Sequence, residues 1–194
     1  MVRLLGRGAR LAVVTNAKDY KTDEERQASV SEVLTFLSEL GFAATELDLR
    51  PYFDQPNDWA AYFNDYDGVW LAGGNTFVLR RALDAAGLSG PLTELVRSGG
   101  LRYGGESAGA IMATPGLTGV QYGDDPDVLP EGYAAPTPWQ GLALVETYLV
   151  PHFSSNWDGA AEMVVALEAD GKPYRTLTDD QAFVVEDERM ERLG

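Results

Sequence analysis

Short apolar runs alternate with amphipathic segments through the first half of the chain. Residues 11–14, 42–47 and 68–72 are apolar runs of strand length, and residues 101–105 form a further short strand that ends at a glycine pair. The segments after the first and third runs carry apolar residues at helical spacing, whereas residues 51–66 are polar and aromatic and predict a loop and a short helix. Strands that alternate with helices predict an α/β fold. We expect one domain over residues 1–194, a three-layer sandwich whose mostly parallel sheet has helices on both faces.

Local signals place the first helix and the loops around it. Thr22 with Glu25 three residues later is a capping box, and Gly41 is expected to end the helix that follows. Parallel strands joined by right-handed crossovers bring their carboxyl-end loops to one edge of a sheet. The loops after residues 14, 72 and 105 should therefore meet.

The periodic pattern lapses between residues 115 and 141, where half of the chain's ten prolines lie. A loop of this length in a compact domain is usually functional or disordered. After it we expect apolar strands or runs, a helix from about Asp158 with Trp157 inward, and a turn into an edge strand. The apolar segments are residues 142–145, 148–150, 174–177 and 182–185, and the turn is at 186–189.

Charge and residue usage exclude several classes of function. Thirty acidic against 15 basic residues give a net charge of −15, which disfavours nucleic acid and anionic membranes as partners. No apolar run approaches the roughly 18 residues that span a bilayer, and the first residues lack the features of a signal peptide, so a cytoplasmic location is expected. With no cysteine and a single histidine, we expect no disulfide, no metal site and no cofactor.

Gly105-Glu106-Ser107-Ala108-Gly109 has the pattern of a nucleophile elbow, in which a serine stands at the tip of a tight strand-to-helix turn. Glycines two residues before and after the serine let the backbone fold back on itself. The turn exposes the hydroxyl of Ser107 and directs the N–H of Ala108 at the group that the serine attacks. By itself so short a pattern also fits a glycine-rich turn with an incidental serine.

A serine nucleophile needs a base, and His152 is the single imidazole of the chain, placed just after an apolar run. The base in turn needs a carboxylate that fixes its tautomer. Five candidates stand in turns, and their spacing does not choose among them: Asp124, Asp125, Asp127, Asp179 and Asp180. Gly73-Gly74-Asn75 follows the neighbouring strand, where glycine lets a backbone N–H approach a substrate oxygen closely and act as a second oxyanion donor. The alternative is a phosphate-binding turn at the start of the helix at Thr76, which the absence of the common glycine-rich phosphate motifs disfavours.

Three ordered blocks resemble the peptidase E family of aspartyl dipeptidases, whose fold is related to that of class I glutamine amidotransferases and is flavodoxin-like. The blocks are residues 72–77, 105–110 and 151–153. The resemblance implies that Ser107 is the nucleophile, His152 the base, and Gly74 and Ala108 the oxyanion donors, with Asn75 beside the substrate. It further implies that Asp124 matters for activity and that Asp179 completes the triad, in place of the family's glutamate.

A second departure from the family concerns specificity. Residues 154–165 contain no lysine or arginine, whereas the aspartyl dipeptidases carry there an arginine that binds the substrate's aspartate. We therefore expect a serine exopeptidase, a dipeptidase or aminopeptidase of broader preference, that hydrolyses short peptides, with the loop at 115–141 walling its cleft. The alternatives are an α/β-hydrolase-type esterase, a non-catalytic binding member of the same fold, and a cyanophycin hydrolase. The sequence leaves a homo-oligomer open.

Overall fold

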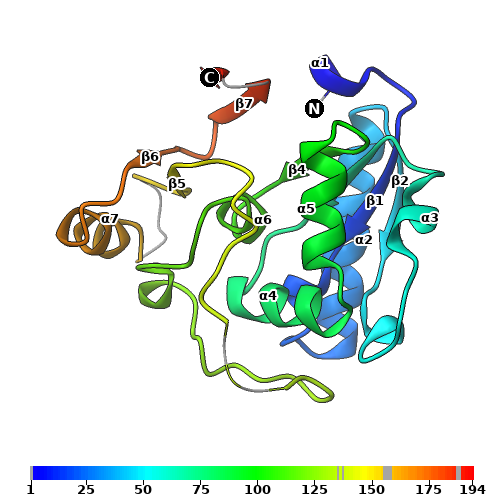
Figure 1. Ribbon diagram of the computed structural model, residues 1–194, viewed down its shortest axis with the longest axis horizontal. Helices are drawn as coiled ribbons and strands as arrows, with labels where there is room; N and C mark the ends of the chain where they lie inside the picture. Colours follow the sequence, from blue (N-terminus) through cyan, green and yellow to red (C-terminus); the bar gives the residue numbers. More distant parts are fainter. Residues whose placement is uncertain (1, 135, 137, 155–158, 187–188) are drawn as a thin grey trace.

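Four parallel strands form the main sheet of the computed structural model, which describes residues 2–134, 136, 138–154, 159–186 and 189–194 (Figure 1). The strand order is β2-β1-β3-β4. The strands are β1 (Arg10–Val14), β2 (Ala43–Leu47), β3 (Gly68–Leu71) and β4 (Arg102–Gly105). Val14 pairs with Leu71, and Leu71 with Gly105, so the carboxyl ends of three strands lie side by side. The loops that the sequence places after these strands do meet.

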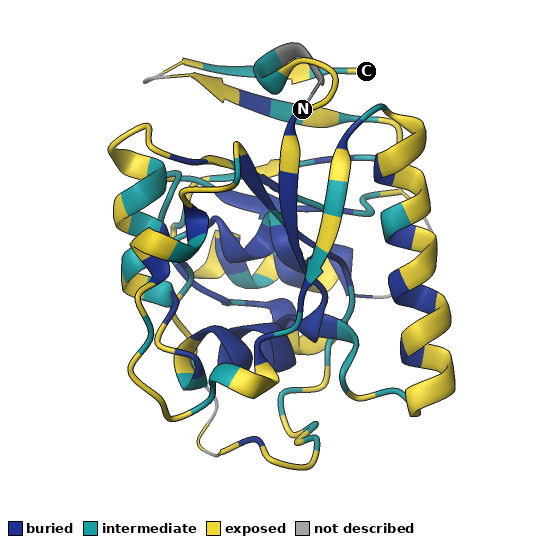
Figure 2. Cartoon of the chain, turned by 90° about the vertical axis from the view of Figure 1, so that its right-hand side faces the viewer, coloured by how far each residue is buried: buried dark blue, intermediate teal, exposed yellow. Residues whose placement is uncertain are grey.

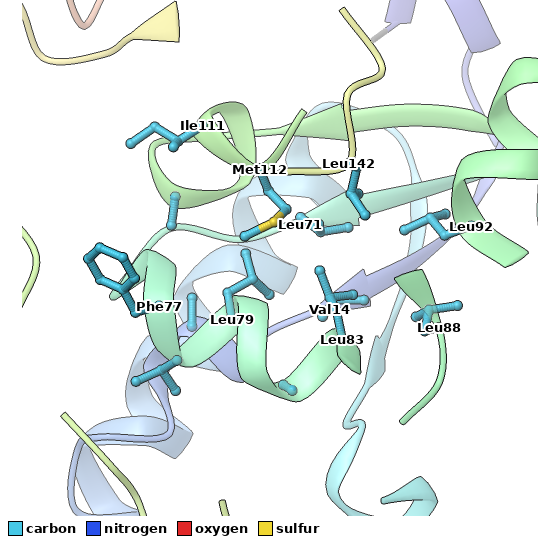
Figure 3. Packing of buried hydrophobic residues seen from close by; sticks show 14 of the residues in the cluster. Val14, Leu71, Phe77, Leu79, Leu83, Leu88, Leu92, Ile111, Met112 and Leu142 are labelled. Carbon is cyan, nitrogen blue, oxygen red and sulfur yellow. The ribbon is translucent and has the colours of Figure 1, made fainter. Parts of the chain in front are cut away.

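Helices cover both faces of this sheet, because alternate residues of each strand point to opposite sides. Leu11 and Val13 pack against Val33 and Leu37 of α2 (Asp23–Glu39). The opposite face is covered by α4 (Thr76–Ala85), α5 (Ser89–Arg97) and α6 (Ala108–Met112). Figure 3 shows side chains of α4 pointing toward Val14 and Leu71 of the sheet. The predicted α/β architecture is confirmed.

The α2 helix begins at the predicted capping box. The Thr22 hydroxyl accepts a hydrogen bond from Glu25 N, and the Glu25 carboxylate accepts one from Thr22 N. Two of the four N–H groups that a helix start leaves without a partner are satisfied in this way. The central strands are buried and the outer sides of the helices are exposed (Figure 2).

The second half of the chain builds two smaller sheets. β5 (Tyr148–Val150) pairs in parallel with β6 (Tyr174–Thr176), and β7 (Ala182–Glu186) pairs antiparallel with β8 (Arg189–Leu193). Residues 142–145 are not a strand, because their backbone N–H groups bond to carbonyls at the end of α6 and just beyond it. The helix α7 starts at Ala160 (Ala160–Ala169), two residues later than predicted, while Trp157 and the centre of the turn at 187–188 lie outside the described residues.

Short elements complete the described part of the chain. They are α1 (Val2–Leu5), η1 (Asn16–Lys18), η2 (Arg50–Tyr52), α3 (Trp59–Phe63) and η3 (Val120–Tyr122). Within the described residues, no helix has the length and apolar character that crossing a bilayer requires.

Side-chain contacts in both directions hold the long loop at 115–141 against the body of the protein. Arg81 donates hydrogen bonds to the carbonyls of Pro126 and Val128, at 2.8 Å each. The Tyr133 hydroxyl donates to Asp19, and the Tyr133 ring meets Phe53 edge to face. The loop is therefore attached to α4 and to the segment that follows β1.

Candidate active site

Ser107 stands between β4 and α6 in a backbone conformation that residues other than glycine rarely adopt, with φ at +50°. The glycines around it are required by close approach. A Cβ at Gly109 would lie 2.0 Å from the Leu71 carbonyl oxygen, and one at Gly105 would lie 2.6 Å from the Gly109 backbone. The strand therefore turns into the helix with no room for a side chain two residues before or two residues after the serine.

His152 brings its imidazole to this serine. It follows β5, also with a positive φ of +58°, and its Nε2 lies 2.9 Å from Ser107 Oγ. Five described residues other than glycine have positive φ, and Ser107, His152 and Ser154 are three of them. Strained backbone persists where the surrounding structure over-determines it, and it concentrates at functional sites.

Asp179 is the carboxylate that meets the imidazole. Its Oδ1 lies 2.6 Å from His152 Nδ1. The pairing of β5 with β6 brings the two residues together, since Val150 pairs with Thr176 and Phe153 N donates to the Leu177 carbonyl. A carboxylate only accepts, so the imidazole proton lies on Nδ1 and leaves Nε2 to accept from the serine hydroxyl.

The chain order of the three residues is serine, histidine, aspartate. The α/β-hydrolases place their acid between the serine and the histidine, and an esterase triad with Asp124, Asp125 or Asp127 as its acid would have this order. Asp179 comes after the histidine instead. The structure thus removes the order-based support for that alternative.

The carboxylate of Asp124 contacts the start of α4, whereas the carboxylate of Asp179 contacts His152 Nδ1. Asp124 Oδ2 accepts from Thr76 N at 2.8 Å and from Thr76 Oγ1 at 2.6 Å. Burial raises the pKa of Asp124, and the two Thr76 hydrogen bonds and the nearby His152 offset part of that rise. The importance for activity implied by the family resemblance stays a prediction, and the geometry gives Asp124 contacts through which it could position the α4 terminus.

The raised pKa of Asp124 has a consequence for stability. Its folded-state pKa lies above the unfolded value of about 4, so ionisation of Asp124 opposes folding. No such cost is present below the unfolded pKa, and the full cost is present above the folded one. We expect Asp124→Asn to gain stability relative to wild type as pH rises through this window. Urea unfolding at a series of pH values measures the difference.

The exposed Asp65, replaced by asparagine, is the matched control for that measurement. Its difference from wild type should change little over the same pH range. Parallel profiles for wild type and Asp124→Asn would show that burial of Asp124 does not disfavour its charge.

Gly74 lies in the loop after β3, next to Gly73, where a Cβ would approach Ser107 Cβ to 3.1 Å. The φ of Gly74 is +144°, and a Cβ on Gly74 would lie 2.3 Å from the Ala17 carbonyl oxygen, so glycine is required. The bond from Asn75 N to that same carbonyl, at 2.8 Å, fixes the loop against η1. Within the described part of the chain, the N–H groups of Gly74 and Ala108 have no hydrogen-bond acceptor.

The side chain of Asn75 is engaged in the fold. Its Oδ1 accepts from the N–H groups of Phe77 and Val78 as the N-cap of α4, and its Nδ2 donates to the Asp125 carbonyl at 2.9 Å. Contact between Asn75 and substrate stays a prediction. Its visible contribution is to join the loop at 115–141 to the start of α4.

A buried polar cluster behind the site was not foreseen from the sequence. Arg26 Nε lies 2.5 Å from Asp19 Oδ1, Arg26 Nη2 lies 2.9 Å from Glu46 Oε1, and the side chain of Asp19 is 1% exposed. Tyr133 also bonds to Asp19. The cluster holds the segment after β1, where the Ala17 carbonyl accepts a hydrogen bond from Asn75 N, next to Gly74. The sequence predicts the α2 helix that carries Arg26. It does not predict that Arg26 is buried, because the hydrophobic pattern marks only apolar residues as inward-facing.

Comparison with known proteins agrees with this α/β fold. The chain matches the family model of peptidase family S51 over residues 4–193. The chain therefore belongs to peptidase family S51. The resemblance to peptidase E stated above is confirmed at the level of the family.

Individual relatives and a solved structure are also similar to this chain. An uncharacterized peptidase of Pasteurella multocida is 30% identical over 121 residues, which span 62% of this chain and 56% of that protein. Peptidase E of Streptomyces coelicolor is 38% identical over 96 residues, which span 50% of this chain and 36% of that protein. A crystal structure of a peptidase E-type protein from Listeria monocytogenes has the same fold, with a TM-score of 0.73 at 19% identity, covering 96% of this chain and 86% of that one.

Proposed function

We propose that this protein is a serine exopeptidase, a dipeptidase or aminopeptidase that hydrolyses short peptides. The observation that carries the proposal is the line of contacts from Ser107 Oγ to His152 Nε2 and from His152 Nδ1 to Asp179 Oδ1. Membership of peptidase family S51 supports the same class of reaction.

In the proposed reaction, the Ser107 oxygen attacks the scissile carbonyl carbon while His152 Nε2 accepts the hydroxyl proton. Asp179 stabilises the imidazolium that forms and holds the ring in its orientation. His152 then gives the proton to the leaving amine as the C–N bond breaks, which leaves an ester on Ser107. A water molecule loses a proton to His152 and attacks this ester. His152 then returns the proton to Ser107 Oγ as the ester C–O bond breaks, and the acid product departs with serine and imidazole restored.

The N–H groups of Gly74 and Ala108 are the proposed oxyanion hole. A donor of this kind stabilises the charge on the tetrahedral intermediate and contributes about 3 kcal/mol in enzymes where one has been removed. Two features support the assignment: both groups lack an acceptor among the described residues, and a Cβ placed at the adjoining Gly73 would lie 3.1 Å from Ser107 Cβ.

The loop at 115–141 borders this site and is proposed to limit substrate length. Asp124 and Asp125 join it to the start of α4, next to Gly74. Because Arg81 and Tyr133 hold it elsewhere, the loop is suited to act as a fixed wall.

Shortening this loop should let longer peptides be cut. Replacing residues 129–132 by two glycines removes neither the carbonyls that Arg81 binds nor the side-chain contacts of Tyr133, and is expected to raise the rate on tetrapeptides relative to dipeptides. Hydrolysis of a peptide series from two to five residues measures this ratio. An unchanged dependence on length would rule out the loop as the limit.

The proposed function is tested by a dipeptide-library screen combined with labelling by a fluorophosphonate. We expect release of free amino acids from several N-terminal residue types, and mass-spectrometric detection of the label on Ser107. If Ser107 stays unlabelled under conditions that label a control serine peptidase, and no dipeptide is cleaved, the chain is a non-catalytic member of its family. Hydrolysis of p-nitrophenyl esters without any dipeptide cleavage would favour an esterase.

A further inference from the structure

Glu106 occupies a position beside the nucleophile that the proposed mechanism does not use. It lies in the turn between β4 and α6, where its N–H donates to the Leu71 carbonyl and its own carbonyl accepts from Gly109 N at 2.8 Å. The backbone of Glu106 is therefore fixed on one side by the end of β3 and on the other by the start of α6. The side chain is half-buried.

The carboxylate of Glu106 points to the loop that carries the proposed oxyanion donor. Its Oε1 accepts a hydrogen bond from Gly73 N at 3.3 Å. A Cβ at Gly73 would lie 3.1 Å from Ser107 Cβ and 3.6 Å from Glu106 Cγ, so the absence of a side chain there leaves serine, glutamate and loop in direct proximity.

This carboxylate has capacity for a cationic partner. Among the residues that the structure describes, no lysine, arginine or histidine nitrogen lies within 4.0 Å of it, and the 3.3 Å bond to Gly73 is long. Lys18 is near enough that the charge of Glu106 acts on its pKa, but burial is the larger effect and lowers that pKa. The net charge of −15 also favours the binding of a positively charged group.

The chemistry of a peptide's N-terminus matches this placement. In an N-terminal residue the α-nitrogen and the carbonyl oxygen are separated by three bonds and lie roughly 3 Å apart. The N–H groups of Gly73 and Gly74 are neighbours along the chain. A carbonyl oxygen held by Gly74 N–H therefore places the α-ammonium close to the carboxylate held by Gly73 N–H.

We infer that Glu106 binds the free α-ammonium group of the substrate's N-terminal residue and so makes the enzyme specific for peptides with an unblocked amino end. This inference rests on the proposed function, and it names the group that makes the enzyme an exopeptidase. Glu106 takes no part in bond making or breaking. Its contribution is a charge-assisted hydrogen bond that orients the scissile carbonyl.

The test compares wild type with Glu106→Gln on a dipeptide and on the same dipeptide with an N-acetyl group. Wild type should prefer the free amine strongly. The variant should lose about 10- to 100-fold in kcat/KM on the free dipeptide, the range expected for one hydrogen bond to a charged group, and change little on the acetylated one. Glu106→Asp should recover part of the loss. Glu162→Gln, on the exposed side of α7, is the control.

Two further measurements separate this inference from the proposed function. Fluorophosphonates carry no ammonium group, so their rate of reaction with Ser107 should be the same in wild type and Glu106→Gln. Calorimetric binding of the free and acetylated dipeptides to Ser107→Ala, with and without Glu106→Gln, reports recognition without turnover. If wild type showed neither dipeptide turnover nor labelling of Ser107, the proposed function would be overturned. The calorimetric affinities would still show whether Glu106 binds the α-ammonium group.

Three results would overturn the inference itself. They are equal losses on free and acetylated dipeptides in Glu106→Gln, a wild-type enzyme that cleaves both equally well, and calorimetric affinities in the Ser107→Ala background that do not depend on Glu106. Binding of the free dipeptide that weakens only when Glu106 is changed supports it.

Discussion

Replacing Ser107 with alanine is expected to reduce kcat for dipeptide hydrolysis by roughly a million-fold, the size of loss seen when the nucleophile of a serine peptidase is removed. The reason is that no covalent intermediate can form, and the imidazole of His152 then has no hydroxyl to activate. The backbone N–H groups remain, so a small residual rate above the uncatalysed reaction is expected. Release of free amino acids over long incubations measures it.

Ser31→Ala provides the control, because Ser31 lies exposed on α2, far along the chain from the site. Both variants should retain the far-ultraviolet circular dichroism of wild type, which shows that the fold is intact. Dipeptide hydrolysis by Ser107→Ala at anything near the wild-type rate would contradict the mechanism as a whole.

Replacing Asp179 with asparagine is expected to reduce kcat by about ten-thousand-fold, as in triads where the same change has been made. An amide can donate to Nδ1, which favours the tautomer with its proton on Nε2, and that tautomer cannot accept the proton of Ser107. The 2.6 Å contact between Asp179 Oδ1 and His152 Nδ1 is the basis of this expectation. The side chain of Asp179 is 58% exposed, so water can partly replace it and soften the loss.

Asp124→Asn is the comparison that decides between the two carboxylates. It keeps an oxygen acceptor for Thr76, so its kcat should fall far less than that of Asp179→Asn. The opposite order, with Asp124 the more sensitive, would assign the third catalytic position to Asp124 and leave the contact of Asp179 without a role in catalysis.

The parts of the structure that were predictable from sequence are those with local causes. The capping box at Thr22, the parallel strands of the main sheet and the meeting of their carboxyl-end loops all follow from short-range patterns. The contact of Ser107 with His152 followed from elimination, since the chain offers one imidazole. Chemistry that depends on a scarce residue type is easier to predict than geometry.

Residue spacing alone could not predict which carboxylate pairs with His152. Asp179 meets His152 because β5 pairs with β6 across an intervening helix, and the register of a three-residue strand pair leaves little trace in the sequence. The family resemblance indicated Asp179, whereas spacing left five carboxylates equivalent. The Asp19–Arg26–Glu46 cluster was missed for a related reason: its members are charged residues from three elements, and nothing local marks them as buried together.

The division of the strands among separate sheets bears on how the site is assembled. Ser107 and Gly74 follow strands of the main sheet, while His152 and Asp179 follow the strands of the small β5–β6 sheet. The same pair of strands thus positions both the imidazole and its carboxylate. Within the triad, one contact joins the two sheets, the 2.9 Å contact between His152 Nε2 and Ser107 Oγ. The packing of the β5–β6 sheet against the main sheet therefore has to be accurate at this one point.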